Sequence, residues 1–247
     1  NGFSSIPQLI NVVTEPLPNP IYAWDFRNKS GSSVIVDSIG NQNAYFYQRN
    51  GTTNNAKTIS SNVGAILNGS TDFIVTDLIN YGSSFSIEVY FKPGNESDVS
   101  GWNRIFSSSP PNEKWNTNTG NGFTFSRIND NQIYTYTNDL GMYVNAENNP
   151  PRAVINNFFE YNTNMHLVFT YNYNTKICNL QWGSKRYTFT YDSLDDVDRK
   201  IFLGWEEGYI TGDIMKGTYY LLRVWDRELA KDHIEHLFNV KDIVDHF

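Results

Sequence analysis

The residues of this chain best suited to hold a ligand are aromatic side chains set in polar loops. Trp115 lies in the Asn-rich segment 107–121, beside Asn116 and Asn118, and Trp102 precedes that segment. An aromatic ring can stack on the apolar C–H face of a sugar, while amide groups hydrogen-bond its hydroxyls. The alternative, in which each indole only anchors its own loop, stays open.

A second long polar segment, 138–164, contains Tyr143. Connections of this length are uncommon inside a compact domain and usually carry function or are mobile. Aromatic-rich loops also make protein interfaces, so the pattern is not specific to sugars. The predicted ligand-binding residues are Trp115, Trp102, Asn116, Asn118 and Tyr143.

The densest acidic cluster lies in the segment 192–198. Its residues Asp195, Asp196 and Asp198 are candidate ligands for Ca²⁺, because carboxylate oxygens suit a hard cation. The spacing is not that of an EF-hand, and a solvated turn has the same composition. The pair Asp25 and Asp37 is a second candidate for calcium.

Residues for catalysis are sparse. Glycoside hydrolysis needs two carboxyl groups facing each other across the scissile bond, but Glu88 is the only acid in its predicted strand. Alternation makes Glu88 a polar group on the concave or solvent-exposed face instead. Cys178 has no neighbouring histidine in sequence, and His233 and His236 lack an obvious third zinc ligand. We therefore expect no enzyme activity, with a glycoside hydrolase as the least favoured function.

Composition excludes several classes. The chain has 247 residues, a formal net charge of −7 and 16 Tyr, 16 Phe and 6 Trp. This acidic balance opposes nucleic-acid binding, which depends on neutralising phosphates. No apolar run is long enough to span a bilayer, so we expect no membrane insertion. A single cysteine excludes an internal disulfide framework.

The elements that must position these residues are short strands. Apolar or alternating runs recur between Asn, Gly, Ser and Asp clusters, the pattern of antiparallel strands joined by turns. The run 85–91 alternates strictly, with Phe85, Ile87, Val89 and Phe91 on one side. The predicted strands are 21–26, 44–48, 63–67, 73–75, 84–92, 104–107, 122–128, 132–137, 166–173, 176–182, 185–191, 200–204 and 217–226.

One helix is predicted, over residues 228–238, because Leu229, His233, Ile234, Leu237 and Phe238 fall at helical spacing. The fold class expected is therefore all-β, an antiparallel two-sheet β-sandwich with one short C-terminal helix. Residues 1–20 hold four of the nine prolines, which central strands do not accept, and are predicted to be a linker or arm.

The order of several motifs resembles the concanavalin A-like lectin/glucanase superfamily, in particular its laminin-G-like jelly-roll branch. The matching segments are Ile21–Phe26, Val36–Asn41, Gly64–Phe73, Phe85–Pro93, Met165–Tyr171 and the closing segment Met215–Leu229. The closing segment contains Leu222-Arg223-Val224-Trp225-Asp226-Arg227-Glu228-Leu229, similar to the V-R-I-Y-D-R-A-L end of the family pattern. Departures include Tyr90 where Trp is common and Ala230 where Ser usually caps the helix.

This resemblance implies that residues 21–247 form a jelly roll of two antiparallel sheets. Members of the superfamily include glycan-binding modules, protein-binding domains and glycosidases, so the fold leaves function open. We expect a non-catalytic recognition module that binds cell-surface or matrix glycans, as part of a larger adhesin, fibre or virion surface protein. Its expected location is extracellular or at a particle or cell surface. The alternative is a structural or protein-interaction domain that binds no sugar.

Overall fold

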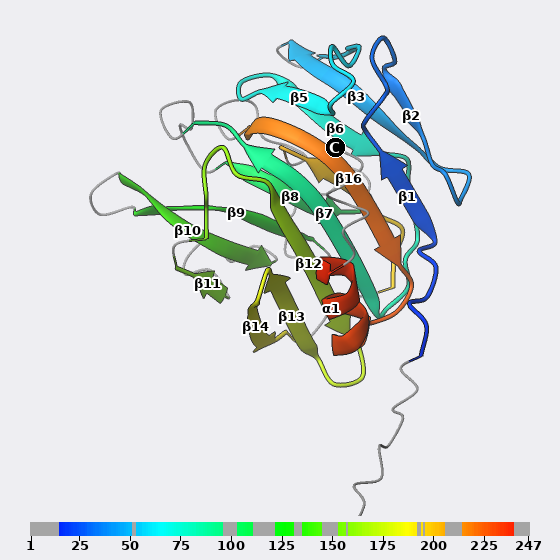
Figure 1. Cartoon of the computed structure of the whole chain (residues 1–247), viewed down its shortest axis with the longest axis vertical. Coiled ribbons are helices and arrows are strands. Elements are labelled where there is room, and N and C mark those ends of the chain that lie inside the picture. The colour runs from blue at the N-terminus through cyan, green and yellow to red at the C-terminus, as the bar shows by residue number, and fades with distance from the viewer. Residues whose placement is uncertain are drawn as a thin grey trace, which may run out of the picture.

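The computed structural model describes residues 15–50, 53–95, 103–110, 122–130, 135–144, 153–156, 158–191, 194, 196–205 and 214–239. For residues 127–130, 135–144 and 153 it describes the backbone only. Within these residues the chain forms two packed sheets and one helix (Figure 1). All pairs between named strands are antiparallel. The predicted β-sandwich is therefore confirmed.

The seven-stranded sheet is built around the closing strand of the chain. Its order is β1 (Tyr22–Asp25), β16 (Lys216–Trp225), β7 (Phe85–Pro93), β12 (Met165–Asn172), β13 (Ile177–Trp182) and β14 (Lys185–Thr190), and β5 (Ala65–Asn68) also pairs with β16. The first and last strands thus lie side by side. The predicted succession of three hairpin strands, β12 to β14, is confirmed, and Gly183 has the positive φ that the second turn needs.

The nine-stranded sheet packs behind the first. Its order is β11 (Ala153–Ile155), β10 (Thr135–Val144), β9 (Phe123–Asp130), β8 (Arg104–Ser109), β15 (Lys200–Leu203), β6 (Asp72–Thr76), β3 (Asn43–Asn50) and β2 (Val34–Val36), and β4 (Thr53–Ala56) also pairs with β3. The strands β2, β4 and β11 were not predicted. Each has only three or four residues, too few to show an alternating pattern.

Aromatic side chains fill the space between the sheets. Phe85, on the predicted inward side of β7, stacks on Phe123 of the other sheet with ring centroids 6.0 Å apart. Phe169 of β12 meets Phe123 at 5.3 Å and Phe125 at 5.0 Å. These rings are fully buried, so the core explains much of the high aromatic content.

The helix α1 (Lys231–Asn239) begins three residues later than predicted. The preceding residues are held by the sheet: the Leu229 backbone N–H donates to Ser86 Oγ at 2.9 Å, and Glu228 accepts from Asn172 and Asn179. The helix lies over the outer face of the seven-stranded sheet (Figure 1). Its residues Ile234 and Leu237 are buried in a cluster with Val168 and Trp225 of that sheet. This face is therefore covered where Val168 and Trp225 point outward.

Residues 15–20 run along α1 and the end of β16. The Trp225 indole N–H donates to the Pro18 carbonyl at 2.8 Å, and Leu17 packs on the apolar cluster under the helix. The proposed division of the chain at residue 20 stays a prediction. No helix among the described residues has the length and apolar character needed to cross a bilayer.

Candidate functional site

A groove opens on the outer face of the nine-stranded sheet. It follows from alternation on three adjacent strands: while Phe46, Ile74 and Leu203 point into the core, their neighbours point outward. Tyr45 and Tyr47 come from β3, Phe73 and Val75 from β6, and Phe202 from β15. Register places Tyr47 beside Phe73, and Val75 between Tyr45 and Phe202. We call the surface formed by Tyr45, Tyr47, Phe73, Phe202 and Trp205 the aromatic groove.

Trp205 reaches the groove because the chain turns sharply after β15. Gly204 has φ +79°, and a Cβ at this position would collide with the Leu67 side chain, so any other residue would be strained here. Ser107 Oγ donates to the Trp205 carbonyl at 2.9 Å and fixes the turn. The indole then packs on Phe73 at 4.6 Å and on Phe202 at 5.5 Å between ring centroids.

The aromatic rings differ in exposure. Trp205 is only 4% exposed and Phe73 is fully buried, so they build the floor of the groove. Tyr45 and Tyr47 are half-buried and stack on each other at 6.0 Å with an interplanar angle of 22°. The Arg49 guanidinium lies over the Trp205 ring, 4.8 Å from its centroid. The two tyrosines are thus the rings that a ligand can reach.

Polar groups line one end of the groove. Asp77 Oδ2 accepts hydrogen bonds from the Asn43 backbone N–H at 2.8 Å and from the Tyr45 hydroxyl at 3.3 Å. Burial raises the pKa of the Tyr45 hydroxyl and the Asp77 carboxylate adds to this rise, so the hydroxyl stays a donor. Lys200 and Asn54 complete the polar lining.

The cavity has a volume of about 670 Å³, within the range of small-molecule sites. It combines accessible aromatic faces with a carboxylate, an ammonium, an amide and a phenol. Rings of this kind stack on a sugar, and the polar groups can bind its hydroxyls. The chemistry available is therefore recognition of a polyhydroxylated ligand.

Sequence reasoning missed this groove. It assigned no ligand to Trp205, which lies two residues after β15. The available signal was the outward alternation of Tyr45 and Tyr47 on one strand and of Phe73 and Val75 on another. The residues predicted to bind ligand cannot be compared with it: Trp102, Trp115, Asn116 and Asn118 lie outside the described residues, and Tyr143 lies in β10, where only the backbone is described.

The predicted calcium ligands are only partly described. Asp195 lies outside the described residues, whereas Asp198 accepts a hydrogen bond from Asn80 Nδ2 at 3.1 Å. The ligand set Asp195, Asp196 and Asp198 stays a prediction. Throughout the described ranges, no three His, Cys, Asp or Glu side chains gather closely enough to hold a metal ion.

The alternative calcium pair has other partners. Asp25 forms an ion pair with Arg27 at 2.7 Å. Asp37 Oδ1 accepts from the backbone N–H groups of Ala23 at 2.8 Å and Ile39 at 3.0 Å. Both carboxylates therefore stabilise the opening strand and turn.

Glu88 lies in a buried charged cluster on the outer face of the seven-stranded sheet. Arg223 contacts the carboxylate with two nitrogens, Nε to Oε2 and Nη2 to Oε1 at 2.8 Å, and His166 Nε2 lies 2.6 Å from Oε1. The Phe238 ring of α1 packs on His166 at 4.3 Å. We call Glu88, His166 and Arg223 the charged cluster. Glu88 lies on the face opposite the core, as alternation predicts, but this part of the face is not exposed to solvent, because the Glu88 side chain has 0% exposure.

The charged cluster also bears on catalysis. Burial alone would raise the pKa of Glu88, but the hydrogen bond and charge of His166 and the Arg223 guanidinium outweigh burial and lower it to about 2. A glycosidase acid must instead hold a proton near neutral pH. Glu88 therefore does not fit the role of general acid.

Cys178 and His233 are the other side chains considered for catalysis or zinc binding. Burial, with a smaller contribution from Glu228, raises the pKa of the Cys178 thiol to about 12, which leaves it protonated and unreactive. His233 Nε2 lies 3.0 Å from the Glu15 carbonyl oxygen. It lines a pocket between residues 15–17 and α1, together with His236 and Asp232.

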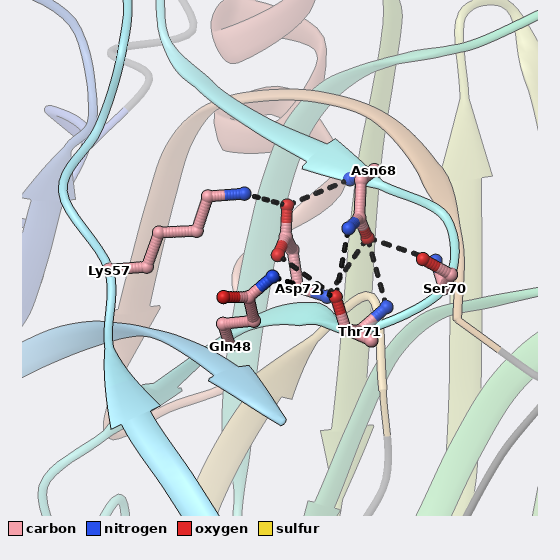
Figure 2. Close-up of polar contacts among 6 residues, drawn as sticks. All are labelled: Gln48, Lys57, Asn68, Ser70, Thr71 and Asp72. Atoms are coloured by element: carbon pink, nitrogen blue, oxygen red, sulfur yellow. Dashed lines mark hydrogen bonds and ion pairs between the residues drawn. The ribbon is translucent and has the colours of Figure 1, made fainter. Parts of the chain in front are cut away.

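The Asn68–Asp72 segment of the family-like motif forms a polar network at the turn from β5 to β6 (Figure 2). Asn68 Oδ1 accepts from the backbone N–H groups of Ser70, Thr71 and Asp72 at 2.9 to 3.1 Å. Lys57 forms an ion pair with the fully buried Asp72 carboxylate. Because β5 and β6 belong to different sheets, this network fixes the point where the chain crosses the sandwich.

Comparison with known proteins identifies the fold only. No protein-family model matches the chain, and no curated protein sequence matches it. Among solved structures, domain 4 of the extracellular GH43 arabinanase AbnA from Geobacillus stearothermophilus, in complex with arabinotriose, is similar with a TM-score of 0.62 and 16% identity, covering 89% of this chain and 98% of that one.

Two further structures have the same fold. Trypanosoma rangeli sialidase has a TM-score of 0.62 and 13% identity over 92% of this chain, which spans only 34% of the sialidase. The carbohydrate recognition domain of Emp46p, in its metal-free form, has a TM-score of 0.50 and 14% identity over 68% of this chain and 85% of that domain. The chain thus shares a β-sandwich fold with sugar-binding and glycosidase proteins, and the laminin-G-like branch stays a prediction.

Proposed function

We propose that this chain is a non-catalytic recognition module that binds a saccharide in the aromatic groove. The observation that carries the proposal is a cavity of about 670 Å³ that contains two accessible, stacked tyrosines. Its polar groups still have hydrogen-bonding capacity that no described residue uses. Internal packing accounts for the buried floor, but it does not need Tyr45 and Tyr47 half-exposed beside Asp77 and Lys200. These are the features of a site that holds a sugar.

The structural neighbours support this proposal at the level of fold. One is a domain solved with arabinotriose, and another is a carbohydrate recognition domain. We propose that the ligand is a glycan of a cell surface or matrix. The chain would then act outside cells or at a particle or cell surface, within a larger adhesin, fibre or virion surface protein.

The test is a glycan-array screen of the whole chain, followed by calorimetric titration with the best ligand and with arabinotriose. The variant Tyr47→Ala removes the accessible ring next to Phe73, and we expect it to weaken binding about tenfold. Far-ultraviolet circular dichroism should stay unchanged, because Tyr47 belongs to the partly buried rim.

The matched control is Tyr173→Ala, which removes a tyrosine that is 41% exposed in the β12–β13 turn of the other sheet. This variant should bind as the unaltered chain does. If Tyr47→Ala binds as well as the unaltered chain, the groove is not the binding site, and the predicted loop residues Trp102 and Trp115 become the candidates.

Repeating the screen with a chelator tests the predicted calcium ligands Asp195, Asp196 and Asp198, since loss of binding would implicate a bound cation.

A second candidate function, protein interaction, is favoured by the edge strand β2. Val34 and Val36 point outward there and are 38% and 64% exposed, and Ile39 follows at 51%. Exposed apolar edge strands can pair with a partner. If the chain assembles through this edge, Val36→Lys should reduce the mass measured by light scattering, whereas a saccharide-binding monomer should show no change.

A further inference from the structure

We infer that the aromatic groove selects a neutral saccharide over an acidic one. This inference rests on the proposed function and adds the charge class of the ligand. It depends on the polar groups at one end of the groove, where Asp77 directly follows β6 and Lys200 begins β15. The hydrogen-bonding capacity that Asp77 and Lys200 still have decides which ligand groups they can bind.

Both charges lie at one end of the groove. Val75 of β6 and Phe202 of β15 are direct partners, and Asp77 and Lys200 lie beyond this pair towards the same end of the sheet. The ladder is irregular here: the Ile201 backbone N–H donates to Thr76 Oγ1 at 3.0 Å, and Ile79 then pairs with Arg199, one residue out of the earlier register. Asp77 and Lys200 both line the groove beside this irregularity.

Neither charge is neutralised in the described part of the chain. Asp77 Oδ2 has two donors, but no described group contacts Oδ1. Lys200 and Asn54 have no side-chain partner among the described residues, although both line the groove. The groove therefore presents an acceptor and a donor of opposite charge in one cavity.

This arrangement suits a neutral polyhydroxylated ligand. Each sugar hydroxyl is both donor and acceptor, so it can donate to Asp77 and accept from Lys200. A carboxylated sugar would gain from Lys200 but would meet the half-buried Asp77 carboxylate in the same cavity. The net charge of −7 adds a weaker repulsion over the whole molecule. Asp77 thus acts against acidic ligands while it binds neutral ones.

The experiment compares neutral oligosaccharides with uronate-containing oligosaccharides on one array, at about 0.05 M and 0.5 M salt, using the whole chain. We expect neutral members to bind and their binding to change little with salt, because few unpaired charges meet. The variant Asp77→Asn keeps the acceptor that caps the Asn43 N–H. It should weaken neutral binding about tenfold and strengthen any residual binding of uronates.

Lys200→Met should weaken neutral binding about threefold. The matched controls are Asp226→Asn and Lys231→Met, which alter exposed charged side chains outside the groove. Tighter binding of uronates, with strong loss in salt and on Lys200→Met, would overturn this inference while preserving the groove as the site. If no saccharide binding responds to Tyr47→Ala, both the inference and the proposed function fail.

Discussion

The outer faces of the two sheets differ in whether their charged side chains are paired. On the seven-stranded sheet, both Glu88 oxygens are engaged by Arg223, and His166 adds a further contact beneath the Phe238 ring. On the nine-stranded sheet, Asp77 keeps one free carboxylate oxygen within the described part of the chain, and Lys200, which lines the same groove, has no ion pair there. The same outward alternation thus gives a closed cluster on one face and an open groove on the other.

The comparison shows that a central carboxylate is not by itself a sign of a functional site. Glu88 lies in the middle of its sheet and its pKa is strongly lowered, but Arg223 and His166 already bind its carboxylate oxygens. Perturbed groups mark active sites only when some of their bonding capacity is left for a ligand. Asp77 has an oxygen left for a ligand among the described residues and Glu88 does not, so the charged cluster is expected to affect stability and the aromatic groove to affect binding.

The largest expected effect comes from removing Glu88. Glu88→Ala leaves Arg223 and His166 without their carboxylate, and we expect the free energy of unfolding to fall by about 3–5 kcal/mol. Urea denaturation measures this loss. The control Glu235→Ala removes an exposed helix carboxylate paired with Lys231 and should cost under about 1 kcal/mol. A similarly small cost for Glu88→Ala would show that the two faces do not differ.

A smaller effect is expected at the turn that positions Trp205. Gly204→Ala forces a side chain into positive φ and against Leu67, which should lower the free energy of unfolding by about 1–3 kcal/mol. It should also weaken saccharide binding, because the floor of the groove shifts. Gly183→Ala is the matched control, since Gly183 also has positive φ but nothing lies near its missing Cβ. If a folded Gly204→Ala protein binds saccharide unchanged, Trp205 does not contribute to the site.

The fold was predictable because its signals are local. Strict alternation in residues 85–91 identified the inner face of β7, and short turns identified the β12–β14 hairpins. The start of α1 was predicted too early because its pattern extends back to Leu229, while tertiary contacts from Ser86 and Asn172 hold residues 228 and 229 outside the helix. Helical spacing alone does not contain that information.

The candidate site was not predictable in the same way. Tyr47 and Trp205 are far apart in the sequence, and only the strand order β3-β6-β15 brings them together. Likewise, Glu88 is separated from His166 and Arg223 by 78 and 135 residues, so its burial could not be inferred from its own strand. Sequence reasoning therefore looked for ligand contacts in loops, whereas the groove comes from the pairing of strands.

The acid dependence of stability distinguishes the charged cluster from the rest of the molecule. Because the folded-state pKa of Glu88 is about 2 and its ordinary value is 4.5, the unfolded chain binds more protons here between these pH values. The contribution of Glu88 is therefore present above pH 4.5 and is lost as pH falls towards 2, with a slope of up to about 1.4 kcal/mol per pH unit. Glu88→Gln should remove that part of the slope, measured by urea denaturation at successive pH values. Equal slopes for the unaltered chain and Glu88→Gln would mean that Arg223 and His166 do not hold the carboxylate ionised, and the contrast between the closed and the open face would then fail.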